Sequence, residues 1–392
     1  MLVSRRYFFF GSLALPALAA KKPEAALRPG ILLLVADQLP AFMLGAYGNK
    51  QVYTPNLDRL ARTGIRFFNH FSCAPAPVPG RATLLTGRTP MQIGPSGAIS
   101  ANDITLDKLL ASNGYTCQEA TGSGALAFLD RQSAANPFFL QVNFQGVRPP
   151  YDPARKYLDR YAAEPFDGYA PEHPAPNAAV GKEYLSNIIA NVRKAAAAVT
   201  AMDDEIGTIL TRLHDRQLLG NTLIVFTAAC GALLGRHGLW DAADASNPPN
   251  MFDQAVSTPI LWSWLGHVPA LAVRPDPISA YDFIPTICEL LSIPVPQRNL
   301  CGRSYAPLAT GKPLPKKQPW RLILCASHGN TDMGREERYK LVLRDNASGP
   351  NELYDLSIDP GETVDRFPDE HYLTIHQELA DAISAWKLKY SS

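Results

Sequence analysis

The sequence predicts an α/β protein. We expect a large domain with a mostly parallel central sheet flanked by helices, then a small C-terminal antiparallel sheet with a closing helix. Short, continuous apolar runs indicate strands that are buried on both faces, as in a parallel sheet. Longer helical patterns separate these runs, as at Leu185–Leu219, which is typical of an α/β arrangement. The apolar runs are Ile31–Ala36, Phe138–Val142, Leu223–Phe226 and Pro259–Trp262.

The C-terminal part has a different pattern. Arg321–Ala326, Arg338–Arg344 and Glu352–Leu356 have the character of strands joined by short polar turns. Leu373, Leu379, Ile383 and Trp386 then recur at roughly helical spacing, which predicts an amphipathic closing helix. The Pro- and Lys-rich stretch Gly311–Pro319 is a plausible connector. We therefore predict domains at 28–310 and 320–392.

The composition narrows the class of protein. A hydrophobic content of 46%, a charged content of 19% and a net charge of +1 are typical of a soluble globular protein. The near-neutral charge and the absence of Lys/Arg runs exclude a general role in binding nucleic acid or a membrane surface. The six cysteines are scattered, which allows one or two disulfides without fixing a pairing.

The N-terminus has the pattern of a targeting segment. Ser4–Phe9 contains Arg5-Arg6 and resembles a twin-arginine signal, and an apolar stretch ending at Ala17-Leu18-Ala19 follows it. We expect a twin-arginine-type signal peptide at 1–20, export of a folded bacterial protein to the periplasm or the extracellular space, and no integral membrane span after cleavage. The alternative is that the segment stays uncleaved as an anchor.

One motif connects the chain to a known family. Cys73–Arg88 resembles the signature of the type I sulfatases, in which a Cys or Ser opens a C-x-P-S-R segment that an apolar run and T-G-R follow. Pro79, Arg81 and Leu84–Arg88 fall in register, and Pro77 occupies the nucleophile position. In the family that residue becomes formylglycine, but proline has no side-chain atom that could attack sulfur. In the alternative frame Cys73 is the nucleophile, but the spacing to Thr86-Gly87-Arg88 is then four residues too long.

The other family positions also depart from the pattern. By the resemblance, Asp37 and Gln38 stand where two Asp ligands of calcium are usual, and Ala229 and Cys230 replace the other two ligands. Arg148 stands at the position of a catalytic His. The usual Lys and His residues have no counterpart in Thr121–Gly124 or Asp241–Asp244. Calcium prefers six to eight oxygen ligands, so we expect Asp37 and Gln38 to be a vestigial pair, with no catalytic residue and no bound cofactor.

The resemblance runs nearly from end to end. Further matching segments are Thr54–Ala61, Gly64–Phe67, Asp282–Ile287, Gly302–Ser304, Glu352–Leu356 and Asp359–Glu362. The segment between Gly122 and Pro137 is short for the family. The missing Lys and His residues belong to the same part of the chain, so we interpret the two losses as one event.

Three functional hypotheses follow. In the first, the protein is an exported pseudoenzyme whose Arg81, Arg148, Arg236 and His237 bind an anionic or sulfated carbohydrate, because Arg forks suit sulfate, phosphate and carboxylate groups. In the second, it is an active sulfate- or phosphate-ester hydrolase with a rebuilt site, using Cys73, Thr83 or Cys230 as nucleophile and His237 as base. In the third, it is the partner of an active homologue in a mixed oligomer. The sequence does not specify an oligomeric state.

Overall fold

The structure is a computed structural model that describes residues 28–391, except 146, 170–172, 315–319 and 346–347. The predicted signal segment 1–20 and the second half of the predicted connector lie outside the described residues. In the part of the chain that is described, no helix combines the length and the apolar character that crossing a membrane requires.

A seven-stranded sheet forms the centre of the large domain, in the order β4-β5-β1-β6-β7-β2-β8. Four of its pairings are parallel, and only the two that involve β7 are antiparallel. The sheet is therefore mostly parallel, as predicted. Its strands are β1 (Gly30–Ala36), β2 (Ile65–Phe67), β4 (Thr116–Ala120), β5 (Phe138–Phe144), β6 (Thr222–Ala228), β7 (Ile260–Ser263) and β8 (Ala272–Arg274).

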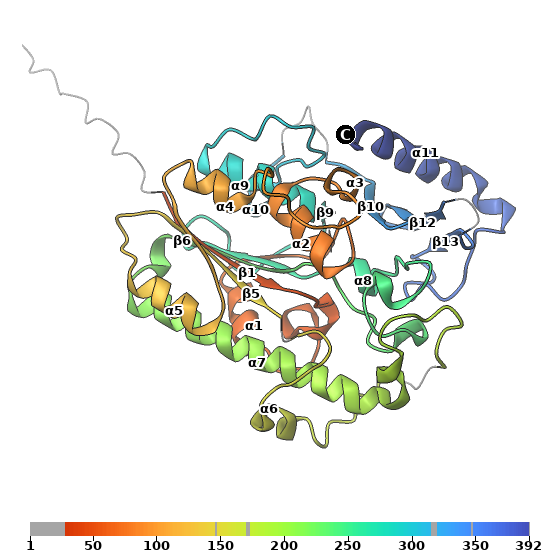
Figure 1. The fold of residues 1–392 in the computed structure, drawn as a ribbon, viewed down its shortest axis with the longest axis horizontal. Coiled ribbons are helices and arrows are strands. Elements are labelled where there is room, and N and C mark those ends of the chain that lie inside the picture. Colours follow the sequence, from red (N-terminus) through yellow and green to blue (C-terminus); the bar gives the residue numbers. More distant parts are fainter. Residues whose placement is uncertain (1–27, 146, 170–172, 315–319, 346–347, 392) are drawn as a thin grey trace, which may run out of the picture.

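Helices cover both faces of this sheet (Figure 1). The face with α1, α5 and α7 buries Leu32 and Leu34 of β1, whereas Ile31 and Leu33 point into the core on the opposite face, beside α2 and α9. This alternation explains why the strand is apolar throughout. The helices of the domain are α1 (Pro55–Arg62), α2 (Pro77–Thr86), α3 (Pro90–Ile93), α4 (Leu106–Ala111), α5 (Gly122–Asp130), α6 (Arg155–Arg160), α7 (Ile188–Asp215), α8 (Asp253–Val256), α9 (Phe283–Leu291) and α10 (Ala306–Ala309). A short pair, β3 (His70–Phe71) and β9 (Ile278–Ser279), lies outside the main sheet.

The C-terminal part forms a four-stranded antiparallel sheet, β10 to β13 in sequence order, and helix α11 (Leu373–Tyr390) closes it. Leu379, Ile383 and Trp386 of α11 are buried against this sheet, which confirms the predicted helix and its apolar face. The strands are β10 (Leu324–His328), β11 (Thr331–Arg335), β12 (Tyr339–Arg344) and β13 (Glu352–Asp355). The predicted fold class is therefore confirmed in both parts.

A buried ionic network joins the two parts. Lys340 of β12 is fully buried and donates to the carboxylate of Asp253 at 2.9 Å and to the carbonyl oxygen of Met251 at 2.7 Å. Its ammonium group also contacts the buried carboxylate of Glu362, and Arg335 pairs with Asp253 at 3.0 Å. Buried charges need such partners, so the network fixes the C-terminal sheet against α8.

Candidate functional site

The segment that carries the family signature forms the start of α2. Ala76 is the extended residue before this helix, and Pro77 is its first residue. Proline suits the first helical position because its ring sets the required φ, but it brings no N–H group and no reactive atom. A Cβ at Gly80 would lie 2.2 Å from the carbonyl oxygen of Ala229. Glycine at this position therefore lets the first turn of α2 pack closely against the end of β6.

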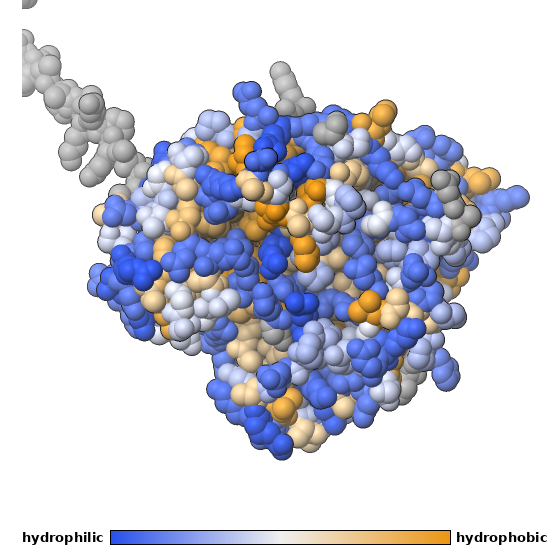
Figure 2. Space-filling model, in the orientation of Figure 1, coloured by the Kyte–Doolittle hydropathy of each residue, from blue (hydrophilic) through white to orange (hydrophobic). Residues whose placement is uncertain are grey.

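A cleft of about 630 Å³ lies in front of this helix start. Figure 2 shows apolar residues gathered near the middle of this face, over α2. On the wall of the cleft His328 Nε2 lies 2.7 Å from Asp244 Oδ1, and this contact lowers the pKa of Asp244. No motif in the sequence marks this pair, because His328 ends a strand of the C-terminal sheet. The lining residues are Ala76, Pro77, Val78, Pro79, Pro90, Met91, Gly94, Pro95, Ser96, Gly97, Asp244, Ser327, His328 and Gly329.

Asp37, Arg81 and Arg148 form a compact cluster, which we call the arginine cluster. Asp37 follows β1 and is 3% exposed. Arg81 Nη1 donates to Asp37 Oδ1 at 2.9 Å, and Arg148 Nε lies 3.4 Å from Asp37 Oδ2. Burial raises the pKa of the Asp37 carboxyl, and the two guanidiniums act in the opposite direction. One turn of helix separates Arg81 from Pro77, so both residues lie on the same face of α2.

Gln38 and Cys230 complete the surroundings of Asp37. Gln38 is buried, and its amide nitrogen donates to Asp241 Oδ1. The Cys230 thiol is fully buried and lies 3.6 Å from the carbonyl oxygen of Asp37. Burial raises the pKa of this thiol well above its usual value, and the nearby carboxylates of Asp241 and Asp37 add to the shift.

These residues do not fit calcium, the metal that the family resemblance implies. Each oxygen of the Asp37 carboxylate already faces a guanidinium. The amide of Gln38 is turned to Asp241, while Ala229 and Cys230 supply a methyl group and a thiol. Calcium requires several oxygen ligands, and this donor set supplies too few. Across the described residues, no group of three or more His, Cys, Asp or Glu side chains is placed to hold a metal ion.

Arg236 and His237 each lie against aromatic rings. The Arg236 guanidinium lies over the rings of Phe42 and Tyr169, at 4.8 and 5.5 Å from their centroids. His237 stacks on Phe252 with a centroid separation of 3.7 Å, and burial lowers its pKa to about 4. Of the four predicted ligand-binding residues, the structure brings only Arg81 and Arg148 together.

The three alternative nucleophiles are buried. Cys73, Thr83 and Cys230 are each 0% exposed. Burial raises the pKa of the Cys73 thiol well above its usual value, and the Thr83 hydroxyl donates to the carbonyl oxygen of Pro79 at 3.0 Å. All six cysteines are free in the structure, whereas the sequence allows one or two disulfides.

The fold and the site define this chain as an α/β protein with a candidate ligand site at one edge of its central sheet. A helix start, a buried carboxylate and two arginines meet at the carboxyl edge of a mostly parallel sheet, where α/β proteins commonly place their ligand sites.

The chain belongs to the sulfatase family. The family described as Sulfatase matches residues 29–133 and 110–293, and the C-terminal region described as N-sulphoglucosamine sulphohydrolase, C-terminal, matches residues 235–389. Arylsulfatase A of Homo sapiens is 26% identical over 85% of this chain and 82% of its own length. Choline-sulfatase of Rhizobium meliloti is 23% identical over 86% of this chain and 81% of its own length.

Solved structures share the fold. A protein solved in complex with its substrate D-glucosamine-2-N,6-O-disulfate superposes with a TM-score of 0.81 at 19% identity, covering 93% of this chain and 98% of that one. The phosphonate monoester hydrolase of Agrobacterium radiobacter superposes with a TM-score of 0.75 at 19% identity, covering 93% and 96% of the two chains. At these identities the likeness extends to the fold alone.

Proposed function

We propose that this protein is an exported, catalytically degenerate sulfatase homologue that binds a sulfated saccharide without cleaving it. The observation that carries the proposal is the pairing of Asp37 with Arg81 and Arg148. The guanidiniums of Arg81 and Arg148 lie beside the Asp37 carboxylate. Pro77, the first residue of α2, has no nucleophilic atom. Covalent catalysis by the family mechanism needs that atom.

The arginine cluster supports an anionic ligand through its charge. Two guanidiniums face one carboxylate, so the cluster carries one surplus positive charge. Arg148 Nε lies 3.4 Å from Asp37 Oδ2 and the Arg148 side chain is 48% exposed, so a ligand in solvent can reach this guanidinium. A guanidinium edge matches sulfate in a bidentate geometry. The neighbouring cleft then offers prolines and Met91 to the saccharide ring, and Ser96 and His328 to its hydroxyl groups.

The rebuilt hydrolase gains no support from the geometry. Each alternative nucleophile is buried, and His237 is stacked on Phe252. Export of the chain rests on the N-terminal sequence pattern and remains part of the proposal.

Calorimetry with D-glucosamine-2-N,6-O-disulfate tests the binding, with unsulfated glucosamine as the reference ligand. We expect saturable binding of the sulfated sugar and at least about tenfold weaker binding by Arg148→Gln, since charge-assisted hydrogen bonds contribute roughly 1.5–3 kcal/mol. Arg155→Gln is the matched control, because the Arg155 side chain is 86% exposed and its ion pair among the described residues is with its helix neighbour Asp159. Equal binding of the two sugars, or hydrolysis of an aryl sulfate by the purified chain, would overturn the proposal.

A further inference from the structure

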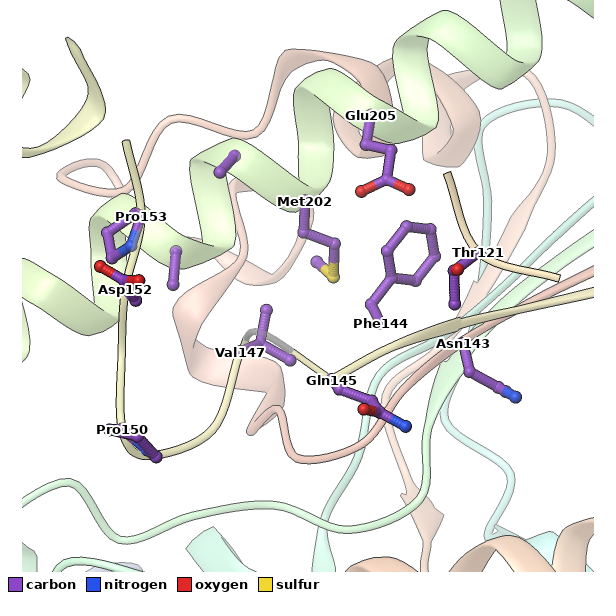
Figure 3. A pocket seen from close by; sticks show the side chains of 12 residues that line it. Thr121, Asn143, Phe144, Gln145, Val147, Pro150, Asp152, Pro153, Met202 and Glu205 are labelled. Atoms are coloured by element: carbon purple, nitrogen blue, oxygen red, sulfur yellow. The ribbon is translucent and has the colours of Figure 1, made fainter. Parts of the chain in front are cut away.

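A second pocket, separate from the cleft at α2, lies between α7 and the carboxyl end of β5. Its volume is about 340 Å³, within the range of small-molecule sites. α7 contributes Ala198, Ala201, Met202 and Glu205, and the chain after β5 closes the other side (Figure 3). The two alanines matter because larger side chains at these helix positions would fill the space.

The floor of this pocket is apolar. It consists of the ring of Phe144, the side chain of Val147 and the thioether of Met202, all three of them buried residues. Figure 3 shows Phe144 and Met202 side by side at its centre. The face of an aromatic ring attracts organic cations, and a thioether is soft and polarisable.

The charged side chains that line the pocket are both acidic. Glu205 and Asp152 lie at different ends of it, and its described lining includes no Lys, Arg or His. Glu205 is held in place because its Oε1 accepts a hydrogen bond of 2.9 Å from the backbone N–H of Gly122. Figure 3 shows the Glu205 carboxylate turned into the pocket, toward the ring of Phe144.

We infer that this pocket binds a small organic ammonium ion with an apolar body. The apolar floor takes the methyl or methylene groups, the Phe144 ring faces the diffuse positive charge, and the Glu205 carboxylate balances it. The uniform negative charge excludes sulfate or phosphate esters from this pocket. The pocket does not suit a bare metal ion, because its two carboxylates lie at different ends and the floor between them is apolar.

The inference is independent of the proposed function. The sulfated sugar is assigned to the arginine cluster and the cleft at Pro77, which share no lining residue with this pocket. Failure of either binding experiment therefore leaves the other interpretation intact.

Calorimetry on the full chain with choline as the probe tests the inference, and 3,3-dimethylbutan-1-ol is its uncharged counterpart of equal shape. We expect saturable choline binding and at least about tenfold weaker binding of the alcohol, since the alcohol lacks the positive charge that would face the Phe144 ring and the Glu205 carboxylate. Equal affinity for both compounds, or no choline binding, would overturn the inference.

Two variants locate the site. Glu205→Gln keeps an oxygen for the Gly122 N–H but removes the charge, and we expect it to weaken choline binding at least about tenfold. Asp204→Asn is the matched control: it makes the same charge change one residue away, where Asp204 accepts from the Tyr157 hydroxyl at 3.0 Å, and it should leave binding unchanged. Ala201→Leu should abolish binding by filling the pocket. Unchanged binding in either Glu205→Gln or Ala201→Leu would contradict the assignment.

Discussion

The pairing of Asp37 with Arg81 leads to a quantitative prediction. At 2.9 Å and an effective dielectric of about 20, the Coulomb attraction is roughly 5–6 kcal/mol before desolvation is subtracted. Breaking a buried pair by removing one partner typically costs about 3–5 kcal/mol. Arg81 is 26% exposed and Arg148 stays beside Asp37 after the change, so we expect Arg81→Gln to lower the free energy of unfolding by about 2 kcal/mol.

The two single variants should differ. Arg81→Gln leaves a buried carboxylate short of a partner, whereas Asp37→Asn leaves two guanidiniums that reach solvent. We therefore expect Asp37→Asn to cost less, about 1 kcal/mol or below. Combining each single variant with Asp37→Asn in a double-mutant cycle gives the coupling energy of the pair. We expect the coupling between Arg148 and Asp37 to be smaller than that between Arg81 and Asp37, under about 1 kcal/mol, because the Arg148 contact is longer and its side chain is half exposed.

Urea unfolding of the wild type, Arg81→Gln, Asp37→Asn and the double variant measures the coupling energy between Arg81 and Asp37. The same titration with about 10 mM calcium tests the site from the other side, since a ligand with a Kd of about 0.1 mM would add about 2.7 kcal/mol. We expect no such gain in the wild-type chain. A coupling energy near zero for Arg81, or a calcium-dependent midpoint that Asp37→Asn removes, would refute our account of the arginine cluster.

Two further predictions concern buried charge. Lys340→Met should destabilise the chain by about 3–5 kcal/mol, because it leaves the Glu362 carboxylate buried without its cation; a loss below about 1 kcal/mol in thermal or urea unfolding would contradict this. His70 is buried and its pKa is lowered to about 3, so the unfolded chain binds its proton first as the pH falls below about 6.5, and wild-type stability drops by up to about 1.4 kcal/mol per pH unit. In His70→Asn that contribution should vanish, so its stability deficit against wild type should narrow between pH 6.5 and pH 4, and a constant deficit would be the contrary result.

In the large domain, the strands that the sequence predicted from apolar runs are buried on both faces of the sheet. The continuous apolar runs gave β1, β5 and β6 to within about two residues of their bounds, because strands buried on both faces need apolar side chains at every position. β4 is a partly exposed edge strand, and Thr331–Arg335 of β11 mixes a carboxylate and a guanidinium with apolar residues. Neither has a continuous apolar run, so neither strand was predicted.

Only the part of the candidate site that is formed by residues close together in the sequence could be predicted. The signature segment assigned Pro77 to the nucleophile position of the family by local spacing alone, and the structure places this residue at the start of α2. The partners of Arg81 and Arg236 could not be read in the same way. One reaches across to Asp37 and the other lies over Phe42 and Tyr169, and both contacts join elements that are far apart in sequence.

The tethered cations give the site a property that a metal site lacks. A bound metal can leave, and its affinity varies with pH and with competing ions. The guanidiniums of Arg81 and Arg148 stay charged at every physiological pH and cannot be removed by a chelator. Under the proposed function, an anion held by the Arg148 guanidinium would therefore be bound without the help of a metal, and Pro77 offers no atom that could attack it. The proposal of anion binding without turnover rests on this combination of two fixed cations and a proline at the start of α2.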